Sequence, residues 1–193
     1  MPLISDDNRW NNYARSVGIG AGLCGALIGL IALIGWAANI PRLTDWTNNG
    51  ISMFPNTALC ALLSGAGLIL YARAHGLLAA LAGGLVTLVA LATLFQHISG
   101  IALGIDTLLW QRDFGARAAA APLRMGVPAS ICFVLIGGSL VASGTRRVVG
   151  RATRARSNHA LRGVRASRRP LHARTHSSGE IDHEPETDRV GPD

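Results

Sequence analysis

The chain has 193 residues, of which 49% are hydrophobic and 15% charged, and its formal net charge is +7. Apolar residues are concentrated before about residue 143 and arginines after it, which excludes one ordinary water-soluble domain. The cysteines lie inside apolar runs, without C-x-x-C or Cys/His spacing, so neither a disulfide framework nor a zinc site is expected.

Residues 1–15 are polar, and the first apolar run follows at residues 17–38. About 22 residues suffice to cross a hydrocarbon core of about 30 Å and are too many for the apolar core of a cleaved signal peptide. Within this run, glycines spaced by four, three and four residues share one helical face: Gly18, Gly22, Gly25 and Gly29. We expect this face to be a helix-packing seam, with a homodimer as one use of it.

A polar link at residues 40–52 comes next, bracketed by Trp36 and Trp46. Tryptophan is enriched where a membrane meets water, so both indoles are expected at that interface. The link itself is therefore expected to lie at the membrane surface.

The second apolar run covers residues 57–74, and Pro55 stands just ahead of it. Asn56 or Thr57 is expected to cap the N-terminus of this helix. Only about two residues precede the third run, residues 77–95, so these two helices should form a tight antiparallel hairpin.

The longest link, residues 96–123, precedes the fourth run, residues 127–143. Its apolar residues predict a short helix over residues 101–110 lying flat in the interface, with Asp106 near the start of that helix. Asp106 is interpreted as a helix cap or, alternatively, as an outward-facing ligand contact. His97 and Asp106 together fall short of a metal site, so no metal, cofactor or catalytic residue is predicted.

Four spans place both ends of the chain on one side of the membrane. Arginines follow the fourth run closely, which predicts that this side is cytoplasmic: Arg146, Arg147, Arg151, Arg154 and Arg156. Residues 1–15 and the tail, residues 144–193, are then cytoplasmic, in a bacterial inner membrane. No ionisable residue lies in the middle of a span, which argues against an ion pump or a carrier of charged substrates.

The tail is Arg-rich and then acidic, and we expect it to be disordered or partly helical. An arginine cluster just inside a membrane typically contacts anionic lipid, at about 1 kcal/mol per residue. Alternatively, this arginine cluster is expected to bind a partner protein. Nucleic acid is the less favoured ligand of this cluster, because no aromatic residues or recognition motif accompany the arginines.

A repeat links the second and fourth runs, because the segment that begins at Met53 recurs in weaker form at Met125. The matched positions pair Cys60 with Cys132, Gly65 with Gly137, and Leu68 with Leu140. Each copy is a polar, proline-bearing start followed by an apolar run, as expected of a helix that begins at a membrane surface.

Two motifs stand out in the chain: residues 53–58 read Met-Phe-Pro-Asn-Thr-Ala, and residues 100–109 read Gly-Ile-Ala-Leu-Gly-Ile-Asp-Thr-Leu-Leu. Together they resemble the multi-pass N-terminal membrane sensor region of bacterial sensor histidine kinases and diguanylate cyclases. The second copy keeps Met125 and a proline but loses Asn-Thr, and the output domains of such proteins do not occur in this sequence. The resemblance implies a signal-input role.

The sequence thus predicts an all-α integral membrane protein with four transmembrane helices arranged as two antiparallel hairpins. A non-catalytic sensory protein is the leading functional hypothesis, with a ligand region at Pro55, Asn56, Thr57 and Asp106. Its partner would be a second copy or a separate cytoplasmic signalling protein. The alternative is a structural membrane protein whose Arg-rich tail binds anionic lipid, nucleic acid or a partner protein.

Overall fold

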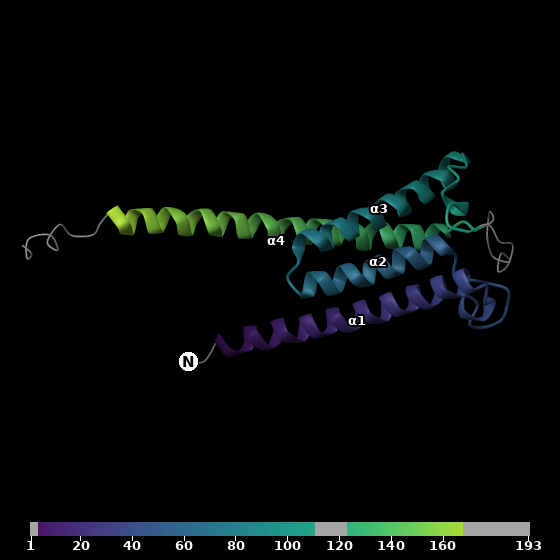
Figure 1. Cartoon of the computed structure of the whole chain (residues 1–193), viewed down its shortest axis with the longest axis horizontal. Coiled ribbons are helices and arrows are strands. Elements are labelled where there is room, and N and C mark those ends of the chain that lie inside the picture. The colour runs from purple at the N-terminus through teal and green to yellow at the C-terminus, as the bar shows by residue number, and fades with distance from the viewer. Residues whose placement is uncertain (1–3, 111–122, 168–193) are drawn as a thin grey trace, which may run out of the picture. The chain divides into compact units, whose positions relative to one another are not determined.

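The computed structural model of the protein describes residues 4–110 and 123–167. In these ranges the long helices are α1 (Ile4–Ala38), α2 (Pro55–Ala72), α3 (Gly76–Ser99) and α4 (Val127–Ser167), drawn in Figure 1. The shortest, α2, has 18 residues and is about 27 Å long. All four are long and apolar enough to cross a membrane, which confirms the predicted all-α fold.

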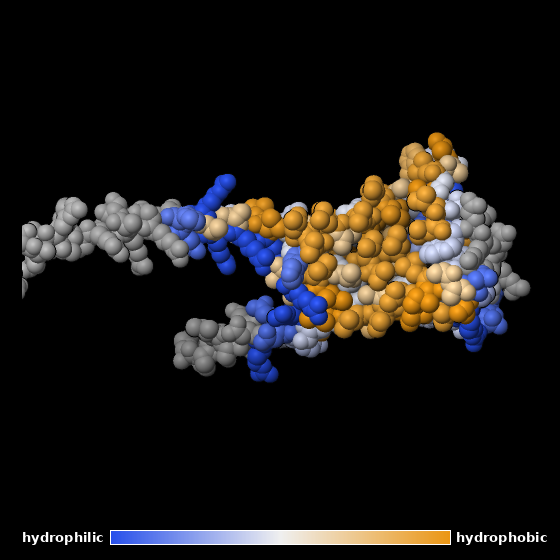
Figure 2. Space-filling model, in the orientation of Figure 1, coloured by the Kyte–Doolittle hydropathy of each residue, from blue (hydrophilic) through white to orange (hydrophobic). Residues whose placement is uncertain are grey.

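The helices carry small side chains inward and large apolar side chains outward. Ala58, Ala79 and Ala90 are fully buried, whereas Leu88 and Leu135 are about two thirds exposed. On the face seen in Figure 2, apolar residues cover the middle of the helices and hydrophilic residues gather near the ends. So large an apolar surface is stable in lipid and not in water, so the chain is a membrane protein.

Glycines bring the helices together as two antiparallel hairpins, α1 with α2 and α3 with α4. A Cβ atom added to Gly29 of α1 would lie 2.5 Å from the Ala58 carbonyl oxygen of α2. A Cβ added to Gly83 of α3 would lie 2.6 Å from the Gly137 carbonyl oxygen of α4. Backbones that approach this closely exclude any side chain, so each hairpin depends on glycine at the contact.

The predicted glycine seam on α1 faces α2 of the same chain. Cβ atoms on Gly22 and Gly25 would lie 2.8 and 3.7 Å from α2 carbonyl oxygens, and Gly29 is closer still. Gly18, in contrast, has no neighbouring atom within 4 Å. The seam therefore builds the first hairpin, and a homodimer would have to use another surface.

The start of α2 differs from the expectation. Pro55 is the first helical residue, Phe54 is the N-cap, and the N-cap side chain makes no hydrogen bond to the helix. The predicted capping by Asn56 or Thr57 is therefore wrong, because proline starts the helix early and places both residues in its first turn. The expected tight turn to α3 is present at residues 73–75.

Three helices extend beyond their predicted spans. Helix α1 begins at Ile4, within the segment predicted to be a polar N-terminus, and α3 runs to Ser99, where Gly100 adopts a left-handed φ of 71°. Hydropathy marks the part of a helix that suits lipid, but the helix itself continues until a residue stops it. The predicted spans therefore stay predictions of the lipid-crossing parts, and these three helices are longer than those parts.

Helix α4 also continues past its predicted end, through the first part of the Arg-rich tail to Ser167. The chain forms two units that divide after Arg151, and residues 152–167 continue the helix in the second unit. Residues 168–193, including the predicted acidic end, lie outside the described residues. Gly144 does not interrupt the helix, because α3 lies against it: an added Cβ would lie 2.9 Å from the Ala80 side chain.

We call residues 39–54 the first link and residues 100–126 the second link, of which the structure describes residues 100–110 and 123–126. The first link and these described parts of the second lie at one end of the four-helix unit, and the turn at residues 73–75 lies at the other (Figure 1). The helix expected over residues 101–110 is absent, and a single 3₁₀ turn, η2 (Ile105–Thr107), takes its place. Gly100 and Gly104 both have left-handed φ angles, 71° and 73°, which a continuous helix cannot contain.

Candidate functional site

The first link is folded around the carboxylate of Asp45. Its Oδ2 accepts a hydrogen bond from the Gly50 backbone N–H at 2.7 Å, and its Oδ1 accepts one from the Asn49 N–H at 3.2 Å. Burial raises the pKa of Asp45, but the hydrogen bonds, led by that from Gly50, outweigh it and hold the pKa below its ordinary value of 3.8. The ionised carboxylate of Asp45 thus stabilises the folded conformation of the first link.

The indole of Trp36 ties this link to α1. Trp36 is fully buried, and its Nε1–H donates to the Met53 carbonyl at 2.8 Å, whereas Trp46 is 53% exposed. Trp36 is therefore shielded by protein, and the expected position of both indoles at the membrane–water interface stays a prediction. The indole lies under the link because the Met53 carbonyl there needs a donor.

Acidification is expected to loosen the first link, because a lowered pKa means that the unfolded link binds a proton more readily than the folded link. The stabilisation by Asp45 is complete above the ordinary value of 3.8 and is lost as pH falls through the lower, folded pKa. The protection factor of the Gly50 amide against hydrogen exchange should accordingly fall in this range. Asp45→Asn should remove the dependence, and constant protection in the wild type would contradict the prediction.

The second link contains a buried polar cluster, which we define as Gln96, Asp106 and Arg124. Asp106 Oδ2 accepts from Gln96 Nε2 and from Arg124 Nε, both at 2.9 Å. The side chains of Arg124 and Asp106 are 14% and 7% exposed. The cluster joins the last turns of α3, the middle of the link and the approach to α4, so three segments depend on one carboxylate oxygen.

Two oxygen atoms of the polar cluster have no hydrogen-bond partner among the described residues. They are Asp106 Oδ1 and Gln96 Oε1, and their residues are 6% and 0% exposed. A buried acceptor left without a donor costs about 1 to 3 kcal/mol. Native proteins leave few such groups, so both atoms are available to a ligand or water that donates hydrogen bonds.

Two side chains beside the polar cluster hold the second link by its backbone. Asn56 Nδ2 donates to the Ile105 carbonyl at 3.1 Å, and His97 Nε2 lies 2.8 Å from the Met125 carbonyl oxygen. The first bond connects the start of α2 to the residue before Asp106. The second connects the end of α3 to the residue after Arg124.

The structure therefore brings together part of the predicted ligand region. Asn56 and Asp106 meet through Ile105, while Pro55 is buried as the first residue of α2 and Thr57 is half-buried one residue beyond Asn56. Asp106 is not a helix cap: it is the acceptor at the centre of a buried ion pair. The alternative interpretation, an outward ligand contact, stays a prediction.

Sequence reasoning missed Gln96 and Arg124. Gln96 was the one amide near the end of the third apolar run, and Arg124 directly precedes the repeated Met125. Neither feature of the sequence indicated that the side chain would bind Asp106. In the described residues, no group of three His, Cys, Asp or Glu side chains is placed to hold a metal ion.

The predicted basic patch lies on α4. Arg146, Arg151, Arg154 and Arg156 are exposed, and Arg147 is half-buried because its guanidinium lies 3.8 Å over the Tyr71 ring of α2. Arg147 also donates a hydrogen bond from Nη1 to the Tyr71 carbonyl. One arginine of the patch thus joins α4 to α2, and the others face the surroundings.

Comparison with protein families, curated proteins and solved structures finds no match for the chain. Its function is therefore inferred from its own residues and their geometry.

Proposed function

We propose that the protein is a non-catalytic, multi-pass membrane protein of the sensory, signal-input type. One observation supports this proposal above the others: the polar cluster couples three segments through Asp106 and leaves two buried acceptors open. A ligand that donates to these acceptors binds one arrangement of the helix ends better than another. Such differential binding is what shifts a protein between two states.

The cluster suits binding better than chemistry. Its carboxylate already accepts from a guanidinium and an amide, so it is engaged as an acceptor and not placed as a free base. A shift of Arg124 away from Asp106 would move the residues that lead directly into α4. Through that helix, a change at the links would reach the opposite end of the bundle.

The proposed location is a bacterial inner membrane, with both termini in the cytoplasm. Arg73 and the α4 residues Arg147 and Arg151 lie at the end of the four-helix unit that holds the turn at residues 73–75. At the other end, Asp45 and Asp106 are folded into the links. At that end Arg124 is paired with Asp106, so the excess of positive charge lies at the end with the turn and favours the cytoplasm for that side.

Replacement of Asp106 by Asn is expected to change helix packing at the far end of the bundle. Spin labels at Val17→Cys of α1 and Val148→Cys of α4, both exposed, would report the distance between these helices in membranes. Native cysteines would first be replaced. We expect two label-to-label distances in the parent protein, one for each helix arrangement. Asp106→Asn should change the ratio of their populations by about threefold or more.

Asp45→Asn is the matched control, because it makes the same substitution in the first link, outside the polar cluster. It should leave the ratio unchanged. Before labelling, the Val148→Cys thiol should be protected from an impermeant maleimide added to intact cells, as the proposed orientation requires. A single distance, identical in all variants, would contradict the sensory proposal.

The alternative, a structural protein whose arginines dock on anionic lipid, has its own support. Between residues 144 and 159, α4 is helical, and it carries five arginines and no acidic residue. A single unchanged distance in the spin-label experiment would favour this alternative.

A further inference from the structure

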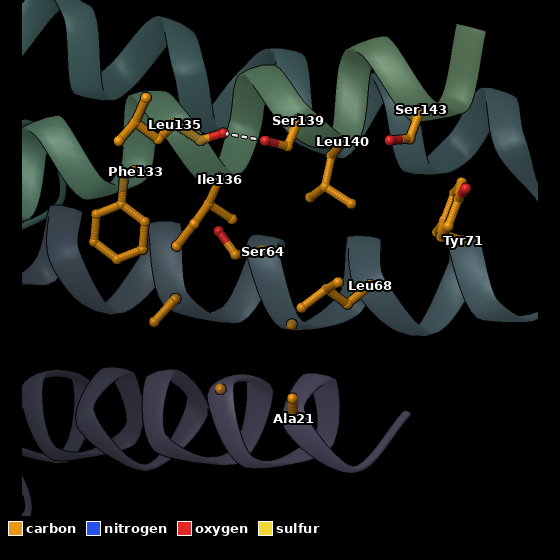
Figure 3. Close-up of a pocket in the computed structure, with 13 residues that line it drawn as sticks. Ala21, Ser64, Leu68, Tyr71, Phe133, Leu135, Ile136, Ser139, Leu140 and Ser143 are labelled. Carbon is orange, nitrogen blue, oxygen red and sulfur yellow. Dashed lines mark hydrogen bonds between the residues drawn. The ribbon is translucent and has the colours of Figure 1, made fainter. Parts of the chain in front are cut away.

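A cleft of about 540 Å³ lies between α1, α2 and α4. Figure 3 shows that α4 covers it from one side while α2 forms the opposite wall, with Phe133, Ile136 and Leu140 directed into it. Small residues give the cleft its depth on the other walls, among them Ala21 of α1 and Ala61 of α2. The volume lies within the range of small-molecule sites, and the lining is almost entirely apolar.

The length of the cleft distinguishes between occupants. On α4 it runs from Phe133 to Ser143 and on α2 from Ala61 to Tyr71, which is about 15 Å on each helix. A bilayer core is about 30 Å thick, so the cleft spans one leaflet and not two. A transmembrane helix from a second copy would need a groove of twice this length, whereas one acyl chain needs no more.

Positive charge lies at one end of the cleft. Tyr71 lines that end, and the guanidinium of Arg147 lies 3.8 Å over its ring. Arg147 donates to the Tyr71 carbonyl, but a guanidinium has five N–H donors, and others stay available. Arg146 lies three residues beyond Ser143, near the same face of α4, and is exposed.

The structure describes the side chains of residues 9–110 and 123–159, and among these the acidic residues are Asp45 and Asp106. Both belong to the links at the opposite end of the bundle. The arginines beside Tyr71 thus have room for an anion, directly beyond an apolar cleft of one-leaflet length.

We propose that this cleft binds one anionic phospholipid. An acyl chain lies along Phe133, Ile136 and Leu140, and the phosphate meets Arg146 and Arg147 at the Tyr71 end. The apolar part supplies contact area, and the charged end selects the headgroup. The site is independent of the polar cluster, so the inference does not rest on the sensory function.

Binding would be measured on the full-length protein in a neutral detergent by native mass spectrometry. Phosphatidylglycerol should be retained more strongly than phosphatidylcholine, and glycerol phosphate, which has the headgroup without chains, should not be retained. Ser139→Phe places a ring at the exposed edge of the cleft and should weaken phosphatidylglycerol binding about tenfold or more. Ala142→Phe is the control, because Ala142 lines a separate groove between α3 and α4.

The charged end is tested separately by Arg146→Gln, which changes an exposed side chain and should reduce the preference for phosphatidylglycerol over phosphatidylcholine. Equal binding by Ser139→Phe and Ala142→Phe would overturn the proposal, since the lipid would then be held elsewhere. Equal binding of phosphatidylglycerol and phosphatidylcholine by the wild-type protein would also overturn it. So would a dimer that only Ser139→Phe dissociates, because the cleft would then belong to a second copy.

Discussion

Gly137→Leu is expected to disrupt the α3–α4 hairpin, with a loss of stability of at least about 1 to 3 kcal/mol. A Cβ atom at this position would lie 2.6 Å from the Gly83 carbonyl oxygen and would press on the Thr87 side chain of α3. The helix backbones must separate to admit it, and the contacts along both helices weaken together. The measurement is the thermal unfolding midpoint in detergent.

The next residue provides the control. A Cβ atom at Gly138 meets nothing within 4 Å, so Gly138→Leu carries the same change of residue without the clash. It should unfold close to the wild-type midpoint. Equal destabilisation by both variants would mean that a large side chain anywhere in this turn of α4, and not the contact with α3, is responsible.

Arg124→Gln is expected to be the most destabilising single change in the second link. It removes the cation from a pair whose side chains are 14% and 7% exposed and leaves the Asp106 carboxylate buried without its ion-pair partner. Losses of about 3 to 5 kcal/mol are typical when one partner of a buried ion pair is removed. The free energy of unfolding, with hydrogen exchange at residues 104–108, would locate the effect.

A second substitution distinguishes the ion pair from a general packing role. Asp106→Asn with Arg124→Gln removes both charges and should be less destabilised than Arg124→Gln alone, because no unpaired carboxylate stays buried. Arg42→Gln, at an exposed arginine of the first link, should have little effect. A double variant as unstable as the sum of its single variants would show that Arg124 and Asp106 do not act as a pair.

The repeat shows how far a sequence pattern can predict packing. Gly65 and Gly137 occupy matched positions in the two copies, and each is the point where the second helix of a hairpin approaches the first. A small residue at a fixed place in an apolar run indicates a close contact. It does not indicate the partner, because lipid, a second copy and a neighbouring helix all satisfy the same pattern.

The sequence by itself determined the four spans, their hairpin order and the two links, since a membrane requires long uninterrupted apolar runs and polar residues between them. Only the tertiary structure decided that the α1 seam meets α2, that Trp36 is buried and that Asp106 pairs with Arg124. Gln96 and Arg124 are ten and eighteen residues from Asp106, and no periodicity connects such positions. Their meeting depends on how two links fold over the helix ends, which is a property of the whole bundle and not of any segment.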